Sequence, residues 1–305
     1  MNQQIESDNQ KELDLEQIFS IIWSKKKAFF SIIILVTTLT VLISLNLPNI
    51  YNSSSLLAPT QPQDSLSSRI GGLSSLSAIG GFSLPETPVS KSKEGIERIK
   101  SFEFFDSYFL PNIKLEDLMA VEEWAAIENK VIYDEDLYNS SKKEWIRKVS
   151  YPRTKKPSAQ EAYKVYKGIL SINQDDKTQF LNISIEHKSP YIAKEWLDII
   201  IYQINESMRK VDADQAERSI AYLNESMKST NIQSIKEAIS QLLEDQIQVL
   251  MLTSSSKYYV FKVIDAPVVK EEKSKPNRFL IVIFGILFGA AISFIFIFLD
   301  YFRRS

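Results

Sequence analysis

Two runs of the sequence, AFFSIIILVTTLTVLISLNL at residues 28–47 and FLIVIFGILFGAAISFIFIFL at residues 279–299, contain no charged residue. As an α-helix, each would be about 30 Å long, which matches the hydrocarbon core of a bilayer. A core helix of a soluble protein normally shows a polar stripe, and a charge-free run of about 20 residues favours a membrane span instead. We therefore expect two transmembrane helices, with the rest of the chain arranged around them.

The charges beside the first run predict its orientation. Lys25–Lys27 precede it, whereas no basic residue follows it before Arg69. Under the positive-inside rule, residues 1–27 are then cytoplasmic, residues 48–278 lie on the opposite side of the membrane, and residues 300–305 return to the cytoplasm. A long polar stretch precedes the run and no small-x-small cleavage site follows it, which favours a retained anchor over a signal peptide.

The inventory of reactive side chains is poor for an enzyme. The chain has no cysteine, and its one histidine is His187. Its net charge of −2 argues against the basic face that a nucleic-acid-binding protein needs. At the end of a predicted strand, His187 is expected to be solvated or locally hydrogen-bonded rather than a catalytic base. The carboxylates at Glu122-Glu123 and at 134–136 are expected to be solvated rather than paired for glycoside hydrolysis. The sequence therefore predicts no catalytic residue, no cofactor and no metal site.

The segment between the two runs predicts a mixed α+β domain. The expected elements are a strand at 50–58, helices at 96–110 and 115–129, a hairpin of strands at 166–172 and 179–186, and a last strand at 258–264. In the second hairpin strand, apolar and polar residues alternate, so one face should be buried. The membrane-proximal part of the domain is therefore expected to comprise residues 48–189 and 257–278.

A long helical arm is expected over residues 190–256. Ser189-Pro190 is a typical helix start, and no proline or glycine follows before Pro267, so one helix can run to about Met227. After a break at 229–231, residues at 3-4 spacing line one face of a second helix: Ile232, Ile235, Ile239, Leu242, Gln246 and Val249. This stripe predicts packing within a helical hairpin and against neighbouring subunits.

Half of the eight glycines lie in the stretch IGGLSSLSAIGGFSL, residues 70–84, at Gly71, Gly72, Gly80 and Gly81. Paired glycines suggest a phosphate-binding loop, but no Lys-Ser/Thr follows them and no strand and helix flank them in register. The remaining interpretation is a surface loop that packs against the domain, faces a lumen or contacts another component. The four glycines are thus candidate loop or oligomer contacts.

The second apolar run also carries a small-residue pattern. Gly285, Gly289 and Ser293 are spaced four residues apart, which places them on one face of a helix and permits close approach of another helix. We expect a helix contact at these positions, either within an oligomer or to a membrane partner.

Several stretches, taken in order, resemble the Wzz-type polysaccharide co-polymerases, the chain length determinant family. They are Asp14-Leu15 through Trp23 to Lys25–Lys27, RIGGLSSLSAIGGFSL from Arg69, HKSPYIAKEWLDIIIYQIN from His187, YYVFKVIDAP from Tyr258, and KPNRFLIVIFGILFGAAISF from Lys275. Their order and spacing carry the resemblance. Pro267 and Pro276 resemble the proline-rich approach of that family to its second span, although lysine and glutamate residues stand between them.

The resemblance implies a bell- or ring-shaped homo-oligomer in the cell inner membrane, with a periplasmic central domain. Such a protein works with a Wzy-type polymerase on a lipid-linked polysaccharide, and it regulates the chain length of an O-antigen-like lipopolysaccharide without catalysing a reaction. One alternative is an exopolysaccharide or capsule adaptor that couples polymerisation to an outer-membrane channel; only residues 300–305 follow the second run, which leaves no room for a kinase domain. A membrane-anchored hydrolase is the third alternative.

Overall fold

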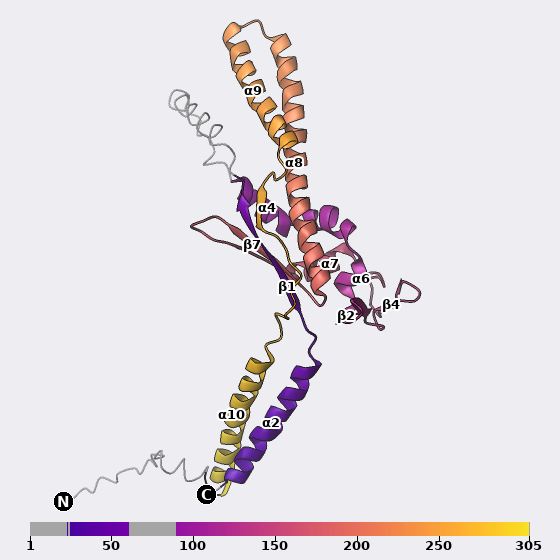
Figure 1. Cartoon of the computed structure of the whole chain (residues 1–305), viewed down its shortest axis with the longest axis vertical. Helices are drawn as coiled ribbons and strands as arrows, with labels where there is room; N and C mark the ends of the chain where they lie inside the picture. The colour runs from indigo at the N-terminus through magenta and orange to yellow at the C-terminus, as the bar shows by residue number, and fades with distance from the viewer. Residues whose placement is uncertain (1–22, 24, 61–89, 305) are drawn as a thin grey trace, which may run out of the picture. The chain divides into compact units, whose positions relative to one another are not determined.

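The computed structural model describes residues 23, 25–60 and 90–304, which form two compact units (Figure 1). One unit contains the described residues up to Asn49 and those from Ser274 onward, and the other is Ile50–Lys273. The four glycines of the predicted loop, Gly71, Gly72, Gly80 and Gly81, lie outside the described residues.

The first unit is a pair of helices, α2 at Lys26–Asn46 and α10 at Arg278–Arg304, which pack against each other. Both are long and apolar enough to cross a bilayer. Ser44 is the one residue of α2 that is buried within the structure, so most of the apolar surface of this helix is free to contact lipid. Two apolar helices near the ends of the chain fit a membrane protein with a central domain between them.

The second unit is built on a four-stranded antiparallel sheet with the strand order β6-β7-β1-β8. Its strands are β1 at Tyr51–Pro59, β6 at Leu170–Gln174, β7 at Leu181–His187 and β8 at Phe261–Asp265. The alternation predicted for β7 is confirmed, because Leu181, Ile183 and Ile185 are fully buried. On β1 the buried positions that pair with these residues include Ser53 and Ser55.

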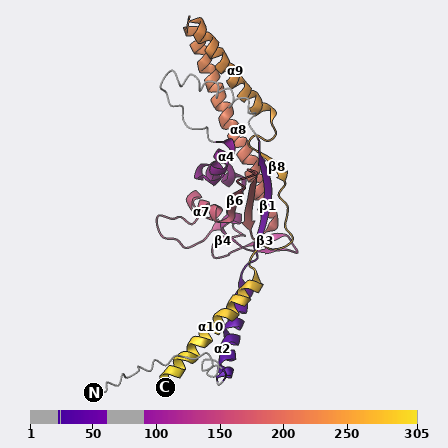
Figure 2. The ribbon, with the colours of Figure 1, turned by 90° about the vertical axis from the view of Figure 1, so that its left-hand side faces the viewer.

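Helices cover one face of this sheet, as Figure 2 shows for α4 and α7. They are α4 at Lys91–Lys100, α5 at Phe102–Phe104, the short turns η1 at Phe105–Phe109 and η2 at Leu110–Asn112, α6 at Leu115–Met119, and α7 at Ala159–Ile169. Aromatic rings fill the space between the helices: the Tyr166 ring lies 5.0 Å from that of Phe105 and 4.9 Å from that of Phe109. Burial of these large rings stabilises this layer.

The helix predicted over 115–129 is wrong beyond its first turn. After α6, the chain forms a hairpin of β2 at Val121–Ala125 and β3 at Lys130–Tyr133, and a smaller one of β4 at Tyr138–Asn139 and β5 at Glu144–Trp145. Asn129 adopts a φ of 49°, which ends any helix and suits a tight turn. The Trp124 ring contacts Tyr51, so tertiary packing outweighs the helical spacing of this segment.

The strand predicted from Tyr166 begins instead at Leu170. Ser158 caps α7 through a capping box with Glu161, and the helix continues through Tyr166 to Ile169. The helix predicted over 96–110 is likewise interrupted at Ser101, whose side chain accepts a hydrogen bond from the Phe104 amide and starts a new helical segment.

The long helical arm is confirmed as α8 at Pro190–Ser229 and α9 at Gln233–Ser255, separated near the expected break (Figure 1). The first half of α8 belongs to the core of the unit: the buried residues from Ala193 to Met208 pack against the sheet and η1. The later part of α8 packs against α9. A single helix therefore joins the sheet to the arm without a hinge residue.

Candidate interaction site

The small-residue face of α10 packs against α2 of the same chain. A Cβ atom added to Gly285 would lie 2.7 Å from the Thr40 hydroxyl oxygen, and one added to Gly289 would lie 3.2 Å from the Val36 Cβ. The Ser293 hydroxyl donates a hydrogen bond of 3.1 Å to the Phe29 carbonyl. The three positions predicted from the sequence therefore lie on one helix–helix contact.

This face is filled by the chain's own first apolar helix. A contact between the same positions and another subunit or a membrane partner stays a prediction, and it would require α2 to move away. A partner that leaves the pair intact must meet α2 or α10 on another face.

The spacing of small residues in α10 did not identify their partner residues on α2. Thr40 stands in the most polar part of the first run, and its hydroxyl donates a hydrogen bond of 2.8 Å to the Val36 carbonyl one turn earlier. This bond fixes the side chain where Gly285 approaches it. Threonines in an otherwise apolar span were the available signal, because polar side chains in a membrane helix usually face another helix.

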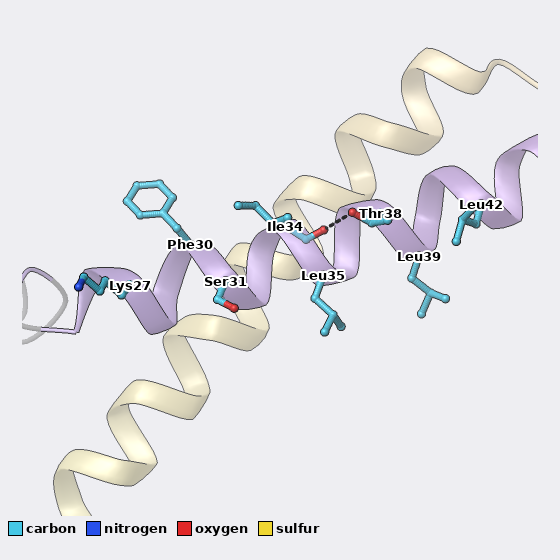
Figure 3. Close-up of a pocket in the computed structure, with 8 residues that line it drawn as sticks. All are labelled: Lys27, Phe30, Ser31, Ile34, Leu35, Thr38, Leu39 and Leu42. Carbon is cyan, nitrogen blue, oxygen red and sulfur yellow. Dashed lines mark hydrogen bonds between the residues drawn. The ribbon is translucent and has the colours of Figure 1, made fainter.

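Another side of α2 carries a shallow hollow of about 690 Å³, shown in Figure 3. Its lining is mostly exposed and apolar: Lys27, Phe30, Ser31, Ile34, Leu35, Thr38, Leu39 and Leu42. The Thr38 hydroxyl donates to the Ile34 carbonyl within the helix (Figure 3), so it presents no unsatisfied donor. Such a surface suits acyl chains or another apolar helix.

The arm leaves much of its predicted stripe uncovered. Ile239 is buried between α8 and α9, whereas Ile232, Ile235 and Leu242 have exposed fractions of 57%, 43% and 48%. The helical hairpin thus accounts for only part of the stripe, and the remainder is a candidate interaction surface.

Asn205 fixes the base of the arm to the sheet. Its side-chain oxygen accepts hydrogen bonds from three consecutive amides, those of Tyr259, Val260 and Phe261, at 2.9, 2.8 and 3.0 Å. Its side-chain nitrogen donates to the carbonyls of Ile201 and Phe261. A buried asparagine on an apolar stretch of α8 was the sequence signal for this role, since such a residue needs partners.

A second polar cluster joins α4, α8 and the chain before β8. The Lys91 ammonium bonds the Asp212 carboxylate and lies 3.0 Å from the Tyr259 hydroxyl, which in turn donates to Asp212 at 2.5 Å. Burial lowers the pKa of Lys91, but its bonds to Asp212 and Tyr259 outweigh burial and raise that pKa above its ordinary value. Burial, followed by the bond to Asp212, also raises the pKa of Tyr259. Lys91 therefore stays charged at neutral pH, where it bonds Asp212.

His187 is locally hydrogen-bonded as predicted, but the alternative of a solvated imidazole is wrong. It lies buried at the end of β7, where its Nδ1 accepts from the Ser189 amide at 2.9 Å. The proton therefore lies on Nε2, which is 2.9 Å from the Asp117 carbonyl. Burial lowers the pKa of His187, so the ring is a neutral structural link between β7 and α6.

The two predicted prolines belong to different units. Pro267 is buried in the second unit just after β8, where the Ser53 and Ser55 hydroxyls donate to the carbonyls of Val268 and Asp265. Pro276 is half-buried in the first unit, two residues before α10.

Within residues 23, 25–60 and 90–304, no cluster of three or more histidine, aspartate or glutamate side chains has a metal-binding arrangement. One well-buried carboxylate has a structural role: Arg147 donates two hydrogen bonds to Glu161, at 3.0 and 2.7 Å. These bonds lower the pKa of Glu161 to about 2.

A match to a family model supports the predicted resemblance. Residues 11–106 match the family model Wzz, chain length determinant protein. A full-length bacterial polysaccharide co-polymerase is 13% identical over 95% of this chain and 98% of its own, with a TM-score of 0.42. A fragment of WzzB, a polysaccharide co-polymerase from Salmonella Typhimurium, is 16% identical over 74% of this chain and 100% of its own, with a TM-score of 0.28. No curated protein sequence matches the chain.

Proposed function

We propose that the chain, whose residues 11–106 match the Wzz chain length determinant family model, is a member of this family and regulates the length of a lipid-linked polysaccharide. The protein acts as an oligomeric scaffold beside a Wzy-type polymerase and has no catalytic residue of its own. The observation that carries the proposal is the family match at the first apolar helix and the domain that follows it. An α+β domain between two apolar helices supports it.

The proposed topology follows from charge. Residues 1–27 and 300–305 are cytoplasmic, 28–47 and 279–299 span the inner membrane, and 48–278 are periplasmic. Lys25–Lys27 before the first span support this orientation.

The proposed homo-oligomer is supported by the exposed apolar side chains of the arm. Ile235 and Leu242, which are seven residues apart on one face of α9 and 43% and 48% exposed, form an apolar surface that water solvates poorly. A neighbouring copy presents the same surface, so lateral association of the arms buries it on both.

The polymerase is proposed to meet the helix pair on a face other than the α2–α10 contact. Phe284 and Phe288 of α10 are 66% and 64% exposed and flank the small-residue stripe. Large apolar side chains on the outer side of a packed pair suit a contact with further membrane helices.

The experiment that tests the proposal is a gel ladder of surface polysaccharide from the source cell with the gene deleted and restored. Loss of a narrow modal length, with short polymer still made and the mode recovered on restoration, is the expected result. An unchanged ladder would refute length regulation. Complete loss of polymer would replace the proposal with an obligatory assembly or export role, such as an exopolysaccharide adaptor.

A further inference from the structure

The base of the arm contains a pocket of about 530 Å³. It lies between α8 and the segment that connects α9 to β8, where Figure 1 shows the end of α9 returning to α8. Its lining is Asp198, Ile201, Tyr202, Asn205, Glu206, Arg209, Ser254, Ser255, Ser256, Lys257 and Tyr258. The volume is in the range of small-ligand sites, about 300–1,000 Å³.

Hydrogen bonds hold the two walls of the pocket together. The Arg209 guanidinium donates to the Ser256 carbonyl at 2.6 Å and to the Lys257 carbonyl at 3.1 Å, and it also bonds Glu206 on its own helix. Next to it, Asn205 fixes the amides that follow Tyr258. The connector is therefore tied to α8 at several points, so the pocket is largely formed before a ligand arrives.

The side chains of the pocket combine aromatic rings with hydrogen-bonding groups of both kinds. Tyr202 is 62% exposed, and Tyr258 lies across the pocket with the Lys257 ammonium 5.3 Å from its ring. The carboxylates of Asp198 and Glu206 accept hydrogen bonds, and serine hydroxyls both donate and accept. The two carboxylates are matched by basic groups: Glu206 bonds Arg209, and Asp198 pairs with Lys194. Lys257 adds a further positive charge, so the lining carries both signs and favours a neutral ligand, and so many polar groups disfavour a purely apolar one.

A carbohydrate matches this set of groups. A sugar ring has a face of C–H groups that packs on an aromatic ring, and a rim of hydroxyls that donate to carboxylates and accept from ammonium and hydroxyl groups. We propose that this pocket binds a short segment of a neutral, hydroxyl-rich polysaccharide, with Tyr202 as the stacking residue and Asp198 as a hydroxyl acceptor. The inference rests on the proposed function for the presence of the polysaccharide, but the binding itself is tested separately.

The full chain in detergent is titrated with oligosaccharide released by mild acid from the surface polysaccharide of the source cell, and binding is followed by calorimetry. Tyr202→Ala should weaken binding at least about fivefold, since truncating an aromatic anchor commonly costs more than 1 kcal/mol. Asp198→Asn should weaken it in the same direction. Tyr222→Ala is the matched control: Tyr222 is on the same helix and is 74% exposed, but it is not in the pocket.

Equal binding by the Tyr202→Ala and Tyr222→Ala variants would overturn the inference, as would no binding to the unaltered protein. A smaller oligomer for Tyr202→Ala, measured by light scattering, with unchanged sugar affinity would show a subunit contact and also overturn it. If gene deletion alters the polysaccharide ladder but the pocket variants bind normally, only the pocket assignment fails. If deletion leaves the ladder unchanged, the proposed function fails whatever the pocket binds.

Discussion

Replacing Gly285 with alanine should push α10 away from α2. The new Cβ would lie 2.7 Å from the Thr40 hydroxyl oxygen and 2.8 Å from its Cβ and Cγ2. Carbon atoms in contact are usually about 3.5–4.0 Å apart, so relief needs a movement of about 1 Å. Thr40 cannot rotate away freely because its hydroxyl is bonded to the Val36 carbonyl.

The expected cost is that of overpacking, about 1–3 kcal/mol. Such a cost raises the population of separated helices by about 5- to 150-fold. Gly289→Ala should have a smaller effect in the same direction, because its Cβ would approach Val36 only to 3.2 Å.

The chain has no native cysteine, so a disulfide can report the contact. Cysteines introduced at Val36 and Gly289 would have Cβ atoms about 3.2 Å apart, close to the 3.5–4.5 Å of a disulfide. The rate of disulfide formation in the full chain should fall when Gly285→Ala is added. Gly168→Ala is the matched control, because it adds the same methyl group to a helical glycine with nothing within 4 Å.

A crosslinking rate for Gly285→Ala equal to that of Gly168→Ala would refute the close contact. A second test is rescue: Thr40→Gly removes all three atoms that the new methyl would meet. The double variant should recover crosslinking relative to Gly285→Ala alone, and additive losses in the double-mutant cycle would contradict the assigned pair.

Three further predictions concern the second unit, each measured by thermal or denaturant unfolding of the full chain. Burial lowers the pKa of His187, so below about pH 6.5 the unfolded chain binds more protons than the folded chain. The free energy of unfolding should therefore fall as pH falls through that value, by up to about 1.4 kcal/mol per pH unit. His187→Asn removes the chain's single histidine and should lack this slope, so it is a clean control. Glu161→Gln should lower the free energy of unfolding by about 1.5–3 kcal/mol at pH 7. In the unaltered protein, the same contribution should be lost as pH falls from 4.5 towards about 2, because the folded-state pKa of Glu161 is lowered. Unchanged stability of the Gln variant would contradict a stabilising pair with Arg147. Asn205→Leu leaves three amides without their acceptor and should cost about 2–5 kcal/mol, whereas Asn205→Asp retains an acceptor and should cost less; equal losses would argue against the acceptor role.

The elements with long, uninterrupted patterns were predicted well. Both apolar helices, the α8–α9 arm with its break, and the buried face of β7 depend on periodicity that extends over many residues. The resemblance to the Wzz family was also available from the sequence, and it is confirmed over residues 11–106.

Short elements were predicted less well because distant contacts decide them. Leu115–Asn129 has helical spacing, yet Trp124 packs against Tyr51, which is more than 70 positions earlier, and the segment becomes a hairpin. The start of β6 was misplaced because Ser158 and Glu161 begin a helix that the β-branched and aromatic residues around Tyr166 had masked.

The candidate sites divide in the same way. The stripe of Gly285, Gly289 and Ser293 could be placed on one helix face by spacing alone, but its neighbour could not be identified, because nothing in the local sequence says which helix will lie against it. The pocket at the arm base brings together residues about 50 positions apart, and only the fold does so.

The sheet has a consequence for how the protein is made. The central strand β1 is synthesised before the other strands of the sheet, and both of its neighbours are synthesised much later. The Ser55 hydroxyl, for example, bonds the Asp265 carbonyl, which is 210 residues further along the chain. At a synthesis rate of about 5–20 residues per second, β1 therefore spends about 10–40 seconds with at least one edge unpaired. An apolar strand left open for that time would invite aggregation. The run Asn52-Ser53-Ser54-Ser55 makes about half of β1 polar, which lowers the tendency of the unpaired strand to aggregate. Ser53 and Ser55 later bond the carbonyls of Val268, just after β8, and Asp265, its last residue.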